Sequence, residues 1–149
     1  MWDLKDKTVV NTGATNGIGK AAALELAKQG PKLLLTFRNQ ELADNLLAEI
    51  KTAAPNVSVE LIYCDFSMQS SIRKCSEEIV ASQDKIDVLI NNAGVVNTSY
   101  HETSEGIENT FAVNHLGYFL FTNLLLNKMK GPEESRIINV SSAAHSFVK

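Results

Sequence analysis

The sequence predicts an α/β fold in which helices cover both faces of a parallel sheet. Short apolar runs alternate with longer helical patterns from Thr8 to Ser141. Strands that alternate with helices form βαβ units, and the right-handed crossovers of these units place helices on both faces. The runs hold few polar residues, which is typical of strands buried on both sides.

Each expected element has its own local signal. The first helix is rich in Ala and Leu and ends at Gly30-Pro31, a common helix stop. The second places apolar side chains at Leu42, Leu46 and Ile50, on one helical face. The expected strands are residues 8–10, 32–37, 57–64, 86–91 and 136–141, and the expected helices are 18–30, 40–55, 68–83 and 108–130.

Size and composition limit the possible classes of protein. A chain of 149 residues predicts one domain, residues 1–149. The 14 basic and 17 acidic residues give a net charge of −3, so no basic field attracts nucleic acid. Cys64 and Cys75 form no CxxC pair and no metal-site spacing. We expect two buried, reduced thiols and no metal site.

The N-terminal residues Met1 to Lys7 alternate in charge and contain no apolar core of a signal peptide. The longest apolar runs are far shorter than the roughly 20 residues of a membrane span. We therefore expect a cytoplasmic protein without a membrane span.

A glycine-rich turn follows the first expected strand. It spans Asn11 to Lys20 and holds Gly13, Gly17 and Gly19. Such a turn lets backbone N–H groups approach a pyrophosphate, and the following helix N-terminus adds partial positive charge. The spacing is not G-x-G-x-x-G, but its place between strand and helix favours nucleotide binding over a plain βα turn.

Three further motifs follow in order. Ile-Asn-Asn-Ala-Gly ends the fourth strand at 90–94, Phe-Ala-Val-Asn-His-Leu-Gly lies in the long helix at 111–117, and Ile-Ile-Asn-Val-Ser-Ser ends the fifth strand at 137–142. Asn114 is a poor helix former and needs a reason to lie in a helix. Together with the glycine turn, these motifs resemble those of the short-chain dehydrogenase/reductase family. The residues in and around the motifs are similar to those of its retinol-dehydrogenase-like branch.

The resemblance implies a Rossmann-type, doubly wound sheet of about five strands in the order 3-2-1-4-5, truncated relative to the full family fold. It also implies that the glycine turn holds a nicotinamide cofactor, that Asp65 accepts from the adenine amino group, and that residues 92–94 pack against the adenosine ribose. The implied cofactor-binding residues are Gly13, Thr15, Asn16, Gly17, Ile18, Gly19, Asp65, Phe66, Asn92, Ala93 and Gly94.

By the same resemblance, Asn114 and Ser142 are catalytic. Ser142 would bond the substrate oxygen and Asn114 would order a water relay; Ser141 is the alternative to Ser142, since neighbours along a strand face opposite ways. The implied substrate is a small-molecule alcohol or carbonyl, lipophilic in the retinol-dehydrogenase-like branch. Relatives dimerise through the helix at 109–130, so a homo-oligomer through this helix is expected.

The end of the second strand indicates the cofactor. An acidic residue there would bind the 2′-hydroxyl of NAD, whereas an Arg suits the 2′-phosphate of NADP. The strand is followed by Arg38 and carries no acid. Because a guanidinium pairs well with phosphate, we predict NADP(H) rather than NAD. The alternative is that Arg38 is a solvated residue at the start of the next helix.

One family feature is missing. The family's general acid/base is a Tyr with a Lys four residues later, and none of Tyr63, Tyr100 and Tyr118 has this spacing. Two hypotheses follow. The chain is the N-terminal part of an oxidoreductase, or it is a short nucleotide- or partner-binding module without catalysis. Under either hypothesis we expect these 149 residues alone to be inactive.

Overall fold

A five-stranded parallel sheet forms the centre of the protein. The computed structural model describes residues 3–131 and 134–143. The strands lie in the order β3-β2-β1-β4-β5, and every neighbouring pair is parallel. This confirms the predicted fold class and strand order. The strands are β1 (Thr8–Asn11), β2 (Lys32–Phe37), β3 (Val59–Tyr63), β4 (Val88–Asn91) and β5 (Arg136–Asn139).

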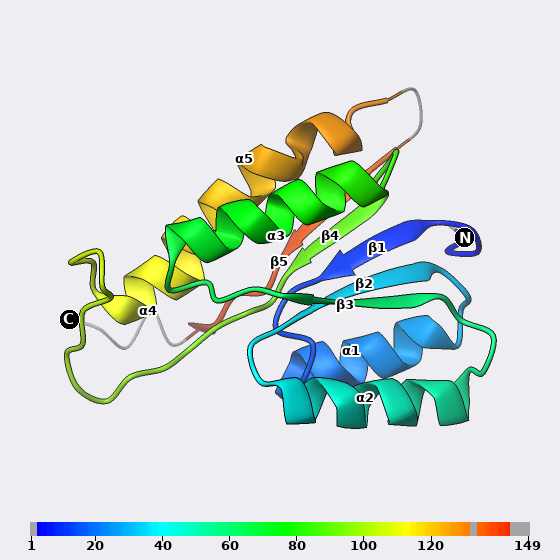
Figure 1. Cartoon of the computed structure of the whole chain (residues 1–149), viewed down its shortest axis with the longest axis horizontal. Helices are drawn as coiled ribbons and strands as arrows, with labels where there is room; N and C mark the ends of the chain where they lie inside the picture. The colour runs from blue at the N-terminus through cyan, green and yellow to red at the C-terminus, as the bar shows by residue number, and fades with distance from the viewer. Residues whose placement is uncertain (1–2, 132–133, 144–149) are drawn as a thin grey trace.

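Helices cover both faces of the sheet, as the crossover rule requires. Figure 1 shows α1 and α2 on one face and α3 and α5 on the other. The long helix predicted at 108–130 forms, but its winding changes to a π-helical turn near its N-terminal end. The helical elements are α1 (Gly17–Ala27), α2 (Gln40–Ala53), α3 (Gln69–Ser82), α4 (Asn109–Phe111), the π-helical turn η1 (Ala112–Leu116) and α5 (Gly117–Met129).

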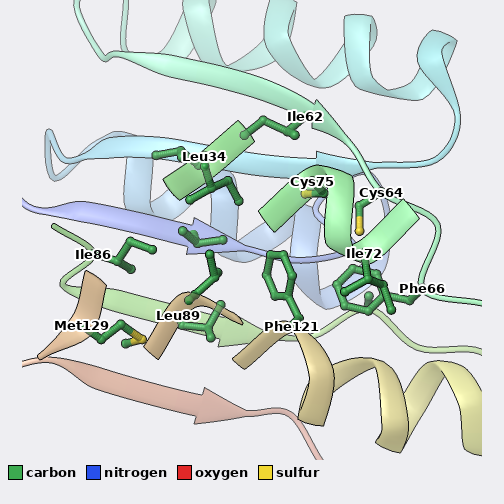
Figure 2. Close-up of a cluster of buried hydrophobic side chains, with 14 of the residues drawn as sticks. Leu34, Ile62, Cys64, Phe66, Ile72, Cys75, Ile86, Leu89, Phe121 and Met129 are labelled. Carbon is green, nitrogen blue, oxygen red and sulfur yellow. The ribbon is translucent and has the colours of Figure 1, made fainter. Parts of the chain in front are cut away.

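Two hydrophobic cores lie on the two faces because strand side chains alternate between them. Leu33 and Leu35 of β2 pack in the core beneath α1 and α2, whereas Leu34 packs in the core beneath α3 and α5. In the second core, Phe66 meets Phe121 edge to face, with ring centroids 5.3 Å apart. Figure 2 shows this core. Both cores pack against the strands, so the sheet holds the loops at its ends in fixed positions.

The two cysteines belong to the core beneath α3 and α5. Cys64 follows β3 and Cys75 lies in α3, and both are buried and unbridged. Figure 2 shows the two residues as neighbours. A hydrogen bond from the Cys64 thiol to Cys75, together with burial, raises the pKa of Cys64 far above its ordinary value. The predicted burial of both cysteines is confirmed, and their reduced state stays a prediction.

The fifth strand has the least cover. All four residues of β5 are exposed, and β5 is an edge strand of the sheet. Within the described parts of the chain, no helix combines the length and the apolarity that a bilayer crossing requires.

Candidate dinucleotide site

A cleft of about 640 Å³ opens at the carboxyl ends of the strands. Loops that follow β1 to β4 supply most of its wall, which is where doubly wound sheets bind ligands. The lining residues are Gly13, Thr15, Asn16, Gly17, Ile18, Thr36, Phe37, Arg38, Asn39, Leu42, Cys64, Asp65, Phe66, Asn92, Ala93, Gly94, Val95, Val113 and Val140. All predicted cofactor-binding residues are in this set except Gly19.

The glycine turn leaves room for a ligand on one side only. Gly13 has φ +64°, and a Cβ there would lie 2.7 Å from the Cα of Ala93. Gly17 has φ +51°, and a Cβ there would meet nothing within 4 Å. Gly19 does not line the cleft, and a Cβ there would collide with the carbonyl oxygen of Gly13 and the side chain of Asn92. Gly19 thus permits close packing inside the turn, and Gly17 borders open space.

Helix α1 begins inside this turn. The side chain of Asn16 caps it by accepting the Gly17 N–H at 2.8 Å. Gly17 and Ile18, in the first turn of α1, line the cleft, and a helix N-terminus favours an anionic group there. This open, positively polarised cradle fits the pyrophosphate of a dinucleotide.

Thr12 fixes the turn against the end of β4. Its hydroxyl donates to the carbonyl oxygen of Ile90 (3.1 Å) and accepts from the N–H groups of Asn92 (2.9 Å) and Ala93 (3.0 Å). The Asn92 amide in turn donates to the carbonyl oxygens of Thr12 (2.9 Å) and Gly13 (3.2 Å). The Thr12 hydroxyl uses its full capacity of one donor and two acceptors, so it has a positioning role.

The end of β2 places a cation at the rim. Arg38 is exposed and lines the cleft. Asn39 caps α2 by accepting the Leu42 N–H at 3.0 Å, which fixes the backbone directly after Arg38. Within the described residues, Arg38 makes no ion pair that would hold it elsewhere. Its guanidinium is therefore available to an anion in the cleft.

The loop after β3 presents Asp65. One carboxylate oxygen accepts from the Ser67 N–H (2.9 Å) and hydroxyl (2.7 Å). The Asp65 N–H donates to the Ser71 hydroxyl at 2.8 Å. These bonds hold the carboxylate at the wall of the cleft beside Phe66, which is buried. Both residues line the cleft, and their contacts with a cofactor stay predictions.

Asn114 lies next to the cleft rather than in its wall. Its side-chain oxygen accepts the Val95 N–H (2.9 Å), and its amide donates to the Val95 carbonyl oxygen (2.8 Å). Asn114 thus clamps the loop that follows Gly94. This explains why a poor helix former lies here, inside the π-helical turn η1. Such turns are frequent at functional sites. The sequence pattern did not predict this one.

Glu108 caps the helix that carries Asn114. Its carboxylate accepts the N–H groups of Thr110 (2.8 Å) and Phe111 (2.7 Å). These backbone hydrogen bonds lower the pKa of Glu108 below its ordinary value.

Ser141 and Ser142 follow β5 and are exposed. Neither lines the cleft, although the neighbouring Val140 does. The assignment of Ser142 over Ser141 stays a prediction. Of the histidines, His101 and His115 are exposed, and His145 lies outside the described residues.

The pKa values of two tyrosines are shifted upward, away from the range that acid–base catalysis near neutral pH needs. Burial raises the pKa of Tyr118 to about 12. A hydrogen bond to Glu102 raises the pKa of Tyr100. A catalytic phenol needs the opposite shift, so neither residue substitutes for the missing Tyr-x-x-x-Lys pair.

The cleft, the glycine turn and the sheet order are together those of the dinucleotide-binding class of α/β folds. The sequence profile of the family described as short chain dehydrogenase matches residues 7–148. The chain belongs to this family, and within it resembles the retinol dehydrogenases.

Three similar proteins illustrate the relationship. Retinol dehydrogenase 13 of Homo sapiens is 45% identical over 139 residues, which is 93% of this chain and 42% of that protein. A metagenomic short-chain oxidoreductase solved in complex with NADP has a TM-score of 0.83 at 30% identity, over 96% of this chain and 65% of that one. A short-chain dehydrogenase/reductase of Burkholderia phymatum in complex with NAD has a TM-score of 0.82 at 25% identity, over 97% and 52%. The chain spans less than half the length of the retinol dehydrogenase that it matches.

Proposed function

We propose that this chain is the cofactor-binding part of an NADP(H)-dependent oxidoreductase that acts on lipophilic alcohols or carbonyls. The observation that carries the proposal is the convergence of the glycine turn, Arg38, Asp65 and residues 92–94 on one cleft. The name of its relative retinol dehydrogenase 13 supports the substrate class.

Each part of the cleft has a role in this proposal. The turn at Gly13 to Gly19 and the N-terminus of α1 receive the pyrophosphate, Asp65 accepts from the adenine amino group, and Arg38 binds the 2′-phosphate. The nicotinamide, when bound, supplies hydride transfer. Asn114 holds the loop after β4 in place, and Ser142 hydrogen-bonds the substrate oxygen.

The preference for NADP(H) rests on Arg38. Similar structures hold either NADP or NAD, so the choice depends on this chain's own residues. We expect Arg38→Asp to weaken NADPH binding about ten- to a hundredfold, as loss of a charge-assisted hydrogen bond worth about 1.5–3 kcal/mol implies. NADH binding should change little. Titration of both cofactors by calorimetry measures this, with Arg73→Asp on the exposed face of α3 as the matched control. Unchanged NADPH affinity would contradict the assignment.

Turnover tests the catalytic half. No Tyr-x-x-x-Lys pair occurs in these 149 residues, and the described Tyr100 and Tyr118 have raised pKa values. We expect NADPH to bind, but NADPH oxidation with a panel of lipophilic aldehydes should not exceed the rate without protein. Robust turnover would disprove the need for that pair.

The same absence supports the second candidate function, a nucleotide-binding or partner-binding module without catalysis. Joining the chain to a family segment that carries Tyr-x-x-x-Lys separates the two. Recovered turnover supports the oxidoreductase, whereas bound cofactor without turnover supports the module.

Self-association through the long helix at 109–130 belongs to the same proposal. Phe119 is 66% exposed and Phe111 is 51% exposed, and Phe119 borders an apolar pocket of about 210 Å³ between α3 and α5. Light scattering of the chain and of Phe119→Glu measures this. The variant should shift a dimer to monomer. The cytoplasmic location stays a prediction.

A further inference from the structure

Thr36 is a buried hydroxyl in a strand that is otherwise apolar after its first residue. It is 1% exposed and follows Leu33 to Leu35, which are fully buried. Even so, Thr36 borders the dinucleotide cleft. A Val would fill the same volume without a polar atom, so the hydroxyl calls for an explanation.

One half of that explanation is the glycine turn. The Thr36 hydroxyl oxygen accepts the Gly13 N–H at 3.2 Å. The Thr36 carbonyl oxygen accepts the Ala14 N–H at 3.3 Å. Thr36 therefore holds the first residues of the turn against the end of β2.

The hydroxyl proton of Thr36 is the second part of the explanation. A threonine hydroxyl can donate one hydrogen bond while it accepts others. Among the described residues, no acceptor receives the Thr36 proton; the hydroxyl only accepts, from Gly13. Buried hydroxyl protons are normally paired. Because Thr36 lines the cleft, a molecule bound there can supply the acceptor.

The position of Thr36 in the cleft indicates which part of a bound cofactor it would contact. The cleft wall also holds Arg38, two residues after Thr36 in the chain. It holds Asp65 as well, three residues after Ile62 of β3, with which Thr36 is in register. The proposed function assigns Arg38 and Asp65 to the adenosine half of the cofactor, and this step rests on that proposal.

We infer that Thr36 is a ligand-binding residue whose hydroxyl donates to an acceptor atom of the adenosine, a ribose oxygen or an adenine ring nitrogen. The same oxygen accepts from Gly13, so one hydroxyl joins the turn that holds the pyrophosphate to the adenosine. Each hydrogen bond polarises the other. Thr36 thereby links two parts of the site that come from different strands.

The experiment compares Thr36→Val, which keeps the shape, with Thr36→Ser, which keeps the hydroxyl. ADP binding is measured by calorimetry for the unmodified chain and both variants. We expect Thr36→Val to weaken ADP binding about three- to tenfold, the range for one net hydrogen bond, and Thr36→Ser to stay within about twofold. Thr52→Val is the matched control, since Thr52 bonds the Ala48 carbonyl on the exposed side of α2.

Adenosine without phosphates separates ligand contact from a purely structural role. It is titrated by NMR, because it does not use the pyrophosphate cradle. Weaker adenosine binding in Thr36→Val supports the inference. A variant that loses ADP affinity but keeps adenosine affinity would show that the hydroxyl acts only through Gly13, and would overturn it.

Two results separate this inference from the proposed function. If the unmodified chain binds no ADP, both fail. If all variants bind ADP and adenosine equally, the inference alone fails and the dinucleotide site stands. Thermal unfolding checks each variant, and Thr36→Cys, a weak donor of similar size, replaces Thr36→Val if that variant does not fold. Its ADP affinity should also fall below that of Thr36→Ser, and equal affinity would overturn the inference.

Discussion

Strands β1 and β5 have nearly the same sequence pattern and opposite surroundings. β1 reads Thr-Val-Val-Asn and β5 reads Arg-Ile-Ile-Asn. Val9 and Val10 are fully buried, whereas Ile137 and Ile138 are 41% and 47% exposed. The comparison teaches that an apolar β-branched run specifies a strand but not its place in the sheet.

Topology makes the difference. β1 lies between β2 and β4, with helices over both faces, whereas β5 pairs with β4 at the edge of the sheet. The two asparagines follow the same division. Asn11 is buried and donates to the Gly19 carbonyl oxygen at 2.9 Å, while Asn139 is exposed and accepts from Asn91 at 2.8 Å. Identical residue types should therefore contribute very differently to stability.

The largest expected difference in stability is between two paired residues of the neighbouring strands β4 and β5. Leu89 of β4 is in register with Ile137 of β5, yet Leu89 is fully buried. We expect Leu89→Ala to lower the free energy of unfolding by about 2–5 kcal/mol, because it leaves a cavity. Ile137→Ala should lower it by less than about 1 kcal/mol. Urea unfolding measures both, and equal losses would show that β5 is covered in solution.

A smaller difference is expected between the two asparagines. Asn11→Ala leaves the buried Gly19 carbonyl without its donor and should lower stability by about 1 kcal/mol, within the usual range for a lost buried hydrogen bond. The loss is moderate because the Asn11 side-chain oxygen already has no partner among the described residues. Asn139→Ala should change stability by less than about 0.5 kcal/mol. Urea midpoints decide, and a larger loss at Asn139 would reverse the comparison.

The smallest expected effect is a pH dependence of stability that arises at the N-terminal end of β4, away from the cleft. The buried carboxylate of Asp87 accepts the Thr8 N–H at 2.8 Å and pairs with Lys85 at 2.9 Å and Lys7 at 3.5 Å. Burial raises the pKa of Asp87, but the Thr8 hydrogen bond and the lysines outweigh it, so the net pKa is lowered.

A lowered pKa stabilises the folded state above the ordinary carboxyl pKa of about 4. That stability is lost as the pH falls through the lowered folded value. Urea midpoints between pH 7 and pH 3 should therefore fall less steeply for Asp87→Asn than for the unmodified chain. Parallel pH profiles would show that the contacts of Asp87 do not stabilise β1 and β4.

Much of the site could be predicted because its residues lie at strand ends that local patterns reveal. The glycine turn, Arg38, Asp65 and residues 92–94 each follow an expected strand, and parallel strands bring their carboxyl ends together. Thr12 and Thr36 were not predicted as site residues. Their roles depend on partners distant in the chain: Thr12 bonds Ala93, 81 residues away, and Thr36 bonds Gly13, 23 residues away.

The sequence by itself determined the order of strands and helices, the glycine turn and the motifs that place this chain among the short-chain dehydrogenases. Periodicity and turn residues are local properties, so they can be seen without coordinates. Only the tertiary structure decided that β1 is buried and β5 exposed, that Gly19 is packed against Gly13 and Asn92, and that Asn114 clamps Val95 from a π-helical turn. Each of these depends on which distant segments meet, and a hydrogen bond or a buried side chain exists only once both partners are in place.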